Sequence, residues 1–137
     1  MTPISDPDLE VEVEVQAVTA WLETDQPAWV TATRFHARNQ ERDGVVVLTA
    51  TSTIGVVGYA VFDHQISHLH YLVTRKDCRR RGVASRIWAR VREEAVHGEV
   101  TAGADTEEGK HRLSAWGFAE ADGVWAYKVP TSRGPIP

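Results

Sequence analysis

Hydrophobic and β-branched residues form three runs between residues 45 and 74, and turn residues separate the runs. The runs are VVVLTAT after Asp43-Gly44, VVGYAVF after Ser52 to Gly55, and ISHLHYLVT after Asp63-His64. Runs of this length and composition, bounded by Gly, Asp and Ser, are typical of β-strands. Their short connections predict an antiparallel meander.

The pattern changes to a helical period after Gly82. Val83, Ile87, Val91 and Ala95 recur four residues apart, which predicts an amphipathic helix over 83–95 that ends before Gly98. Beyond it, EVTAGA at 99–104 predicts a strand, and a short helix follows that begins at Asp105 or Thr106 and closes at Gly117. VWAYKV at 124–129 predicts a final strand.

The N-terminal third has a mixed pattern. Leu9, Val11, Val13 and Val15 alternate with polar residues as in a strand, whereas Val15, Val18, Trp21 and Leu22 have helical spacing. Both interpretations of residues 9–15 stay open, and a further helix is predicted over 29–40. The predicted fold class is α+β, a mixed sheet with helices packed on it. One domain is expected over 9–130, between flexible tails at 1–8 and 131–137.

The composition is that of one ordinary globular domain, with 137 residues, 42% hydrophobic and 25% charged. The formal net charge of −4 argues against nucleic acid as the main partner. Cys78 is the single cysteine, so an internal disulfide is excluded and a reducing compartment is favoured. The sequence has neither a signal-peptide pattern nor an apolar run of about 18 residues. We therefore expect a cytoplasmic protein that does not bind membranes.

The segment HLHYLVTRKDCRRRGVASRIWARV carries the clearest chemical signal. A strand leads into the basic turn Arg79-Arg80-Arg81-Gly82, and a helix begins directly after it. The first turn of a helix has free N–H groups and a positive dipole end, and glycine lets a ligand approach the backbone closely. This combination predicts a site for a phosphate-bearing ligand. A solvated basic patch and a nucleic-acid patch are the alternatives for the same cations.

Three motifs resemble the GNAT superfamily of N-acetyltransferases. Residues 79–84, RRRGVA, match the Q/R-x-x-G-x-G/A signature that opens the helix after the fourth strand. IGVVGYAVF resembles the preceding strand, and LSAWGFAEADGVWAYKV resembles the C-terminal part of the family. The resemblance covers residues 44–129. It implies a mostly antiparallel sheet, splayed after the fourth strand, with helices on both faces.

The resemblance also implies acetyl-CoA as acyl donor and a primary amine as acceptor, on a small molecule or a protein. In the family the splayed strand binds the pantetheine arm and the following turn holds the pyrophosphate. The matching residues here are Leu72, Val73 and Thr74 for the strand, and Arg79, Arg80, Arg81, Gly82, Val83, Ala84 and Ser85 for the turn. A backbone N–H near Val73 or Thr74 is the expected oxyanion donor. Small relatives often dimerise, so a homodimer is compatible with the resemblance.

The general base of the family often lies some six residues before Thr74, which gives His68. A histidine of ordinary pKa can accept the amine proton directly or through water. His70 is a weaker candidate on the same strand face, and a packed structural histidine is the alternative for both. His64 lies close in sequence, but ligands at metal-site spacing are missing, so no metal is predicted.

The chain departs from the family at Leu113, where many relatives have a tyrosine that protonates the leaving thiolate. This departure leaves open an acyl-CoA-binding sensor with weak or no turnover. Cys78 is interpreted as a spectator whose pKa the neighbouring arginines lower. Trp116 and Trp125 are expected to pack the C-terminal half, and Trp21 and Trp29 to pack the core or line an acceptor pocket.

Overall fold

The computed structural model describes residues 8–95 and 98–129, and within them the strands form one seven-stranded sheet in the order β1-β2-β3-β4-β5-β7-β6. The first four strands pair antiparallel in chain order and confirm the predicted meander. They are β1 (Glu12–Ala17), β2 (Val45–Ser52), β3 (Gly55–Asp63) and β4 (His68–Thr74). The alternation at the N-terminus is therefore a strand, which starts three residues later than the pattern indicated.

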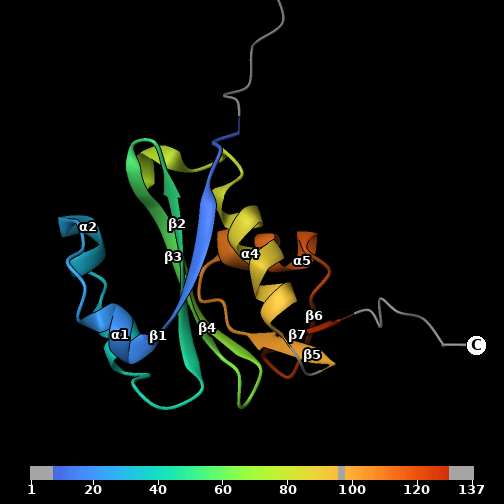
Figure 1. Ribbon diagram of the computed structural model, residues 1–137. Coiled ribbons are helices and arrows are strands. Elements are labelled where there is room, and N and C mark those ends of the chain that lie inside the picture. The colour runs from blue at the N-terminus through green and yellow to red at the C-terminus, as the bar shows by residue number, and fades with distance from the viewer. Residues whose placement is uncertain (1–7, 96–97, 130–137) are drawn as a thin grey trace, which may run out of the picture.

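The second half of the sheet joins the first through one short parallel contact. Strand β5 (Glu99–Ala102) pairs with β4 only at His68–Thr101 and Leu69–Ala102. Beyond Leu69 the two strands diverge, so the sheet splays at this point, as Figure 1 shows. Strand β5 also pairs antiparallel with β7 (Val124–Lys128), which pairs with β6 (Ala119–Ala121). The predicted mixed, mostly antiparallel sheet is confirmed.

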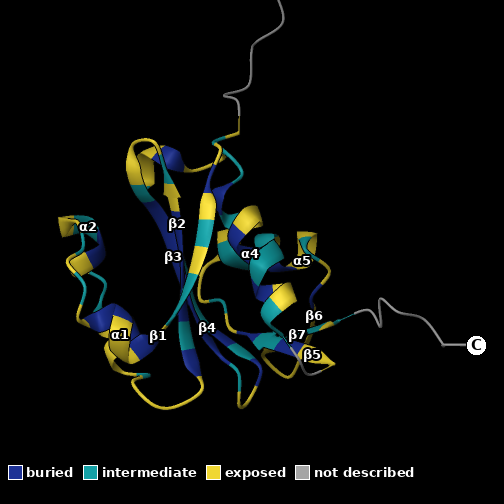
Figure 2. Ribbon diagram, in the orientation of Figure 1, coloured by how far each residue is buried: buried dark blue, intermediate teal, exposed yellow. Residues whose placement is uncertain are grey.

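Helices cover both faces of the sheet (Figure 1). The short helices α1 (Val18–Leu22), α2 (Ala28–Thr31) and α3 (Phe35–Arg38) lie on one face, and α4 (Val83–Glu94) and α5 (Glu107–Ala115) lie on the other. Each face has its own apolar cluster, around Trp21 and Tyr59 on the first and around Ile87 and Trp88 on the second. Figure 2 shows that the central strands between the two layers are the most continuously buried part.

The helix predicted over 29–40 is divided into α2 and α3. The hydroxyl groups of Thr33 and Tyr59 lie 2.6 Å apart, and Tyr59 also donates to the Thr33 carbonyl. The Arg34 guanidinium donates to the carbonyl of Thr24 at 2.9 Å. These contacts to β3 and to the loop after α1 stabilise the turn between the two helices. They join residues far apart in the sequence, so the hydrophobic periodicity of residues 29–40 could not predict them.

Three boundaries in the C-terminal half also differ from the pattern. Helix α4 ends at Glu94, because Ala95 already has an extended backbone with ψ of 113°, three residues before Gly98. Strand β5 covers only the first four residues of the segment 99–104. Strand β6 was not predicted, because Ala119–Ala121 is exposed and has no hydrophobic alternation. Gly117 follows α5 with φ of +97°, which confirms the predicted end of that helix.

Gly58 brings α4 close to the meander. A Cβ atom at this position would lie 3.0 Å from side-chain atoms of Val83 and Ile87 and 3.0 Å from the carbonyl oxygen of Val73. Such distances are too short for unstrained packing, so only glycine lets the first turns of α4 rest on β3. The phosphate-type turn that precedes α4 is thereby held beside the end of β4.

Candidate cofactor cleft and catalytic residues

The cleft begins where β4 leaves β5. In the ladder with β3, Leu69 pairs with Phe62 and Tyr71 pairs with Val61, so His70 is an extra residue in β4. This β-bulge leaves the extra residue without a ladder partner, and bulges often redirect a strand beside an active site. From His70 to Thr74, β4 also lacks a backbone partner from β5. Backbone polar groups of β4 are therefore available to a ligand in the cleft.

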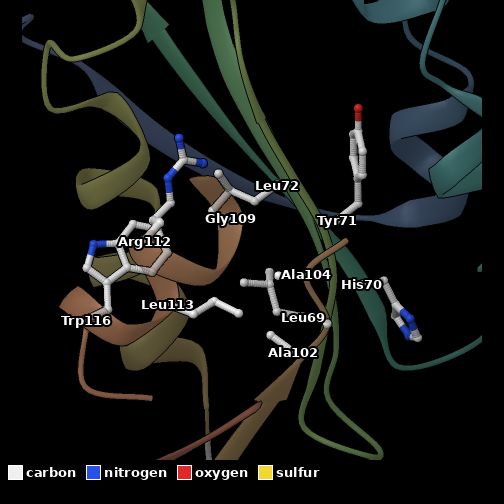
Figure 3. A pocket seen from close by; sticks show the side chains of 11 residues that line it. Leu69, His70, Tyr71, Leu72, Ala102, Ala104, Gly109, Arg112, Leu113 and Trp116 are labelled. Carbon is white, nitrogen blue, oxygen red and sulfur yellow. The ribbon is translucent and has the colours of Figure 1, made fainter. Parts of the chain in front are cut away.

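A hollow of about 110 Å³ lies in the cleft between β4, β5 and α5. Figure 3 shows Leu69 and Leu72 of β4 on the side of Leu113 and Trp116. The side chain of Tyr71 points to the opposite face of the sheet, where it packs with the aromatic cluster of α1–α3. The side chains on one face of β4 therefore line the largely apolar hollow, and Tyr71 on the other face packs against the N-terminal helices.

A second hollow of about 230 Å³ lies under the first turn of α4. Gly82 precedes this helix in the left-handed region with φ of +80°, and Arg80 has φ of +63°. The turn directs the free N–H groups and the positive dipole end of α4 toward the hollow. The residues of the predicted phosphate turn that line it are Arg79, Arg80, Gly82, Val83, Ala84 and Ser85.

The hydroxyl of Thr74 supplies an independent sign of a polar ligand in this second hollow. Thr74 lines the hollow and is only 6% exposed, and its Oγ1 atom has no hydrogen-bond partner among the described residues. A buried hydroxyl without a partner costs free energy. A polar ligand arm that passes β4 would satisfy it, so the residues present fit the coenzyme A that the sequence predicted.

Arg112 and Trp116 of α5 line both hollows, so the two hollows are adjacent. They lie four residues apart on one face of the helix, with the guanidinium carbon 5.9 Å from the ring centroid. Trp116 stacks on Trp88 of α4, with centroids 5.5 Å apart and an interplanar angle of 9°. Sequence reasoning had assigned Trp116 to packing and had not identified Arg112, although their spacing on a helix was a usable signal.

Arg75 and the three arginines of the basic turn differ in their environments. Arg75 forms an ion pair with Asp77 at 2.6 Å, so that charge is already compensated. Arg79 and Arg80 are exposed, whereas Arg81 is half-buried and its carbonyl accepts the N–H of Leu9 at 2.9 Å.

Cys78 beside the turn and Leu113 on α5 are both buried. Burial raises the pKa of the Cys78 thiol, with the Asp77 carboxylate acting in the same direction, and together they outweigh the lowering by Arg75 and Arg81, so the pKa is raised and not lowered. Leu113 is buried and lines the cleft hollow, whereas Ser114 is exposed and lines neither hollow. A proton donor for the thiolate is therefore missing at the position where many relatives have tyrosine.

His68 and His70 lie together at the closed end of the cleft, with ring centroids 4.7 Å apart. Nδ1 of His68 is 2.6 Å from Oγ1 of Thr101 on β5. Burial lowers the pKa of both histidines, and the charge of His70 lowers the pKa of His68 further. Both rings are therefore neutral near pH 7, which is the form that can accept a proton.

Asp63 at the end of β3 completes this polar group. Its carboxylate is 1% exposed, and Oδ2 accepts a hydrogen bond from Arg42 and lies 3.4 Å from Nε2 of His70. Oδ1 accepts the backbone N–H groups of Gln65 at 2.9 Å and Ile66 at 3.4 Å. The sequence pattern had marked Asp63 only as a turn residue and had not singled out Arg42, which is 21 residues away.

Trp21 belongs to the core rather than to a site. It is fully buried, and its Nε1 donates to Oγ1 of Thr49 at 3.0 Å. Trp29 packs at the edge of the same cluster, with its ring 6.2 Å from Tyr59. Across residues 8–95 and 98–129, His, Cys, Asp and Glu side chains form no group of three suited to a metal ion, and no helix is long and apolar enough to cross a membrane.

Solved structures share this architecture at low sequence identity. A GNAT-family acetyltransferase from Desulfovibrio desulfuricans matches with a TM-score of 0.67 and 11% identity, over 88% of this chain and 100% of its own. An N-acetyltransferase from Staphylococcus aureus matches with a TM-score of 0.60 and 14% identity, over 88% and 99%. The N-acetyltransferase YhhK from E. coli, solved with coenzyme A bound, matches with a TM-score of 0.62 and 16% identity, over 88% and 99%.

The family assignment rests on the sequence model. No curated protein matches the chain in sequence. The model of the acetyltransferase (GNAT) family, however, matches residues 11–123, which is most of the chain and includes both hollows and the histidine pair. The predicted family is thus confirmed, and the match begins further toward the N-terminus than the motifs and ends at residue 123, within the third of them. The chain belongs to the GNAT acetyltransferase family.

Proposed function

We propose that this acyltransferase moves the acetyl group of acetyl-CoA to a primary amine by direct attack on the thioester. The observation that carries the proposal is that the two hollows are adjacent and share Arg112 and Trp116 in their lining. Together they run from the anion-binding turn of α4 to the cleft where β4 leaves β5. A long ligand with a pyrophosphate at one end and a thioester at the other matches this course.

The donor would bind through backbone groups at both ends. The N–H groups of the turn from Arg79 to Ser85 would hold the pyrophosphate, with Arg112 as an additional cation. The backbone of Leu72, Val73 and Thr74, which has no partner from β5, would bind the pantetheine arm, and the Thr74 hydroxyl would gain its missing partner. Coenzyme A bound to YhhK, which has the same fold, supports this donor.

The chain's own residues supply positioning and electrostatic stabilisation. The narrow slot beside Leu72 and Leu113 would orient the thioester, and bringing two reactants into line is a large source of acceleration. A backbone N–H near Val73 or Thr74, in the part of β4 that has no partner from β5, would stabilise the developing oxyanion. His68 and His70, neutral at pH 7, are the groups near the cleft that could take the amine proton. A thiol of pKa about 8.5 leaves as the thiolate without an acid.

The acceptor would approach from the face of the sheet that carries α1–α3. Helix α5 and its side chains occupy the other face of the cleft, whereas Tyr71 packs against the cluster of the N-terminal helices and His70 lies on the same side of β4 as Tyr71 (Figure 3). We propose a small-molecule amine or a protein amine as acceptor. The single cysteine and the use of acetyl-CoA favour a cytoplasmic location.

An acyl-CoA-binding sensor is the second candidate, and Leu113 is the observation that favours it. The buried leucine lines the hollow where relatives have a proton-donating tyrosine. A domain that binds acyl-CoA without fast turnover would retain the anion turn and the slot but would not need an acid.

An acceptor screen separates the two functions. The full chain is mixed with acetyl-CoA and a panel of polyamines, amino acids, aromatic amines and peptides, and the free thiol of released CoA is measured. The enzyme predicts thiol release above the buffer rate with at least one amine. Saturable binding of acetyl-CoA without release across the panel would contradict the enzyme and support the sensor.

A further inference from the structure

We propose that His70 is the proton acceptor of this reaction, and that Asp63, held in place by Arg42, is the residue that positions it. The inference rests on the proposed acetyl transfer and names groups within that site. It changes the order of the two histidines, because sequence spacing had favoured His68.

The hydrogen-bonding pattern leaves one nitrogen of His70 available. Nε2 lies 3.4 Å from Oδ2 of Asp63, which can only accept, and 3.3 Å from Nη2 of Arg42, which can only donate. Because Nη2 of Arg42 already donates to Oδ2 of Asp63, we assign the proton of the neutral ring to Nε2, facing the carboxylate. Nδ1 then has the lone pair, and it has no hydrogen-bond partner among the described residues. This is the arrangement of a general base whose tautomer is set by a carboxylate behind it.

Asp63 is fixed at both of its oxygens. Oδ1 accepts two backbone N–H groups of the turn between β3 and β4, from Gln65 and Ile66. Oδ2 accepts from Arg42, whose guanidinium also lies 3.3 Å from Nε2 of His70. Because the carboxylate is buried and cannot rotate without losing one of these sets, it keeps the His70 ring in one orientation.

The backbone also places His70 better than His68. His68 lies opposite Thr101 in the part of β4 that is still paired with β5, and its Nδ1 is used by the Thr101 hydroxyl. His70 is the bulged residue and the first one beyond the parallel pairing. Its side chain therefore lies beside the point where the cleft begins, on the side of β4 away from Leu113 and Trp116 (Figure 3), and His68 packs edge-on against it.

The step balances with these residues. The amine lone pair attacks the acetyl carbonyl carbon and forms the C–N bond, and the C–S bond breaks to release the CoA thiolate. The proton that the amine nitrogen loses goes to Nδ1 of His70. The imidazolium formed is stabilised by Asp63, and its proton then passes to solvent or to the thiolate, which restores the neutral ring.

The described contacts place three charged or titratable groups against His70, namely Asp63, Arg42 and His68. Burial lowers the pKa of His70 most, the Asp63 carboxylate raises it, and Arg42 lowers it. Removing the carboxylate should therefore lower the His70 pKa further, and removing the guanidinium should raise it. Opposite shifts would show that the carboxylate and the guanidinium both act directly on the His70 ring.

The first test needs no acceptor. Histidine NMR titration of the ¹³C,¹⁵N-labelled full chain follows the His70 ring in the wild type, Asp63→Asn and Arg42→Gln. Asparagine keeps an oxygen for the N–H groups of Gln65 and Ile66 but presents an amide to His70, so the turn is retained. We expect the Nε2–H tautomer in the wild type, a lower His70 pKa in Asp63→Asn and a higher one in Arg42→Gln. Asp122→Asn, an exposed change in the β6–β7 turn, is the matched control and should shift nothing.

An unchanged His70 titration in Asp63→Asn, or an Nδ1–H tautomer in the wild type, overturns the inference. Turnover supplies the second test once the wild type releases CoA with an amine of the panel. His70→Gln should lower kcat by about 10²- to 10⁴-fold. In Asp63→Asn, the acidic limb of the pH profile of kcat/KM should shift to lower pH, by the same amount as the His70 pKa. Normal turnover by His70→Gln would overturn the base assignment alone, whereas the wild-type reaction would still support the proposed function.

Discussion

Nδ1 of His68 on β4 lies 2.6 Å from Oγ1 of Thr101 on β5, directly beside the last backbone pair that joins the two strands. The two residues are also partners in the parallel register. The side-chain contact therefore lies at the point where β4 and β5 separate. Beyond this point the backbone of β4 has no partner from β5 and can bind a ligand. The hydrogen bond between the two side chains thus helps to set the position at which the cleft begins.

Replacing Thr101 by valine tests this apex contact. Valine keeps the branched shape, but the partner of the half-buried His68 nitrogen is lost, which should cost about 1–2 kcal/mol of unfolding free energy. Urea unfolding at pH 7.5 measures the change. Thr51→Val at an exposed position of β2 is the control and should stay within about 0.5 kcal/mol of the wild type. Equal stability of Thr101→Val and wild type would contradict a role for the contact.

Thr74→Val should separate ligand binding from stability. The buried hydroxyl has no partner in the described chain, so a methyl group in its place should leave the free protein equally stable or more stable. Binding of coenzyme A should weaken by about 2- to 10-fold, because a hydrogen bond of about 0.5–1.5 kcal/mol is lost. Calorimetric titration with coenzyme A measures the affinity. Unaltered affinity would show that the hydroxyl does not face the bound ligand.

Arg112→Gln should weaken coenzyme A binding by about tenfold or more, because a charge-assisted contact to a phosphate contributes about 1.5–3 kcal/mol. The difference from the wild type should shrink as salt is raised from 50 to 500 mM, since salt screens the charge. Lys110→Gln on the same helix lines neither hollow and pairs with Glu107, so it is the matched control. Equal losses in both variants would contradict a specific role for Arg112.

Much of this site could be predicted from local sequence, and the reasons are physical. The turn at Gly82 combines a strand, cations, a glycine and a helix start within a few residues, so its chemistry is visible in one segment. The antiparallel meander could also be predicted, because each strand and each turn is marked by residues that are close together in the sequence. The role of Arg112 and Trp116 is not visible in the segment itself, because it depends on how α5 packs beside β4 and α4.

The polar group behind His70 could not be predicted in this way. Asp63 and Arg42 meet only after β2, β3 and β4 have paired, and a turn aspartate has the same sequence pattern whether or not it contacts a histidine. The bulge at His70 also depends on register between strands. Tertiary contact likewise divides the helix at Thr33, where Tyr59 binds the backbone.

The stability of the protein should fall in mild acid because of the two histidines. Burial lowers the pKa of His68 and of His70 below the value of about 6.5 in the unfolded chain. The unfolded state therefore binds more protons as the pH drops below 6.5, and the free energy of unfolding decreases. Urea unfolding at pH 7.5 and 5.5 should show this loss, and the double variant His68→Gln, His70→Gln should show less of it. An equal loss in both proteins would assign the acid sensitivity to other groups.

Binding of acetyl-CoA to the full chain tests the central claim most directly. A ligand that binds only the folded state raises its stability, by about 2.7 kcal/mol at one hundred times the dissociation constant. A heat scan with increasing acetyl-CoA should therefore raise Tm progressively by several degrees. The rise should be smaller for Arg112→Gln than for Lys110→Gln at the same ligand concentration. A Tm that stays constant up to millimolar acetyl-CoA would contradict the account of the cleft.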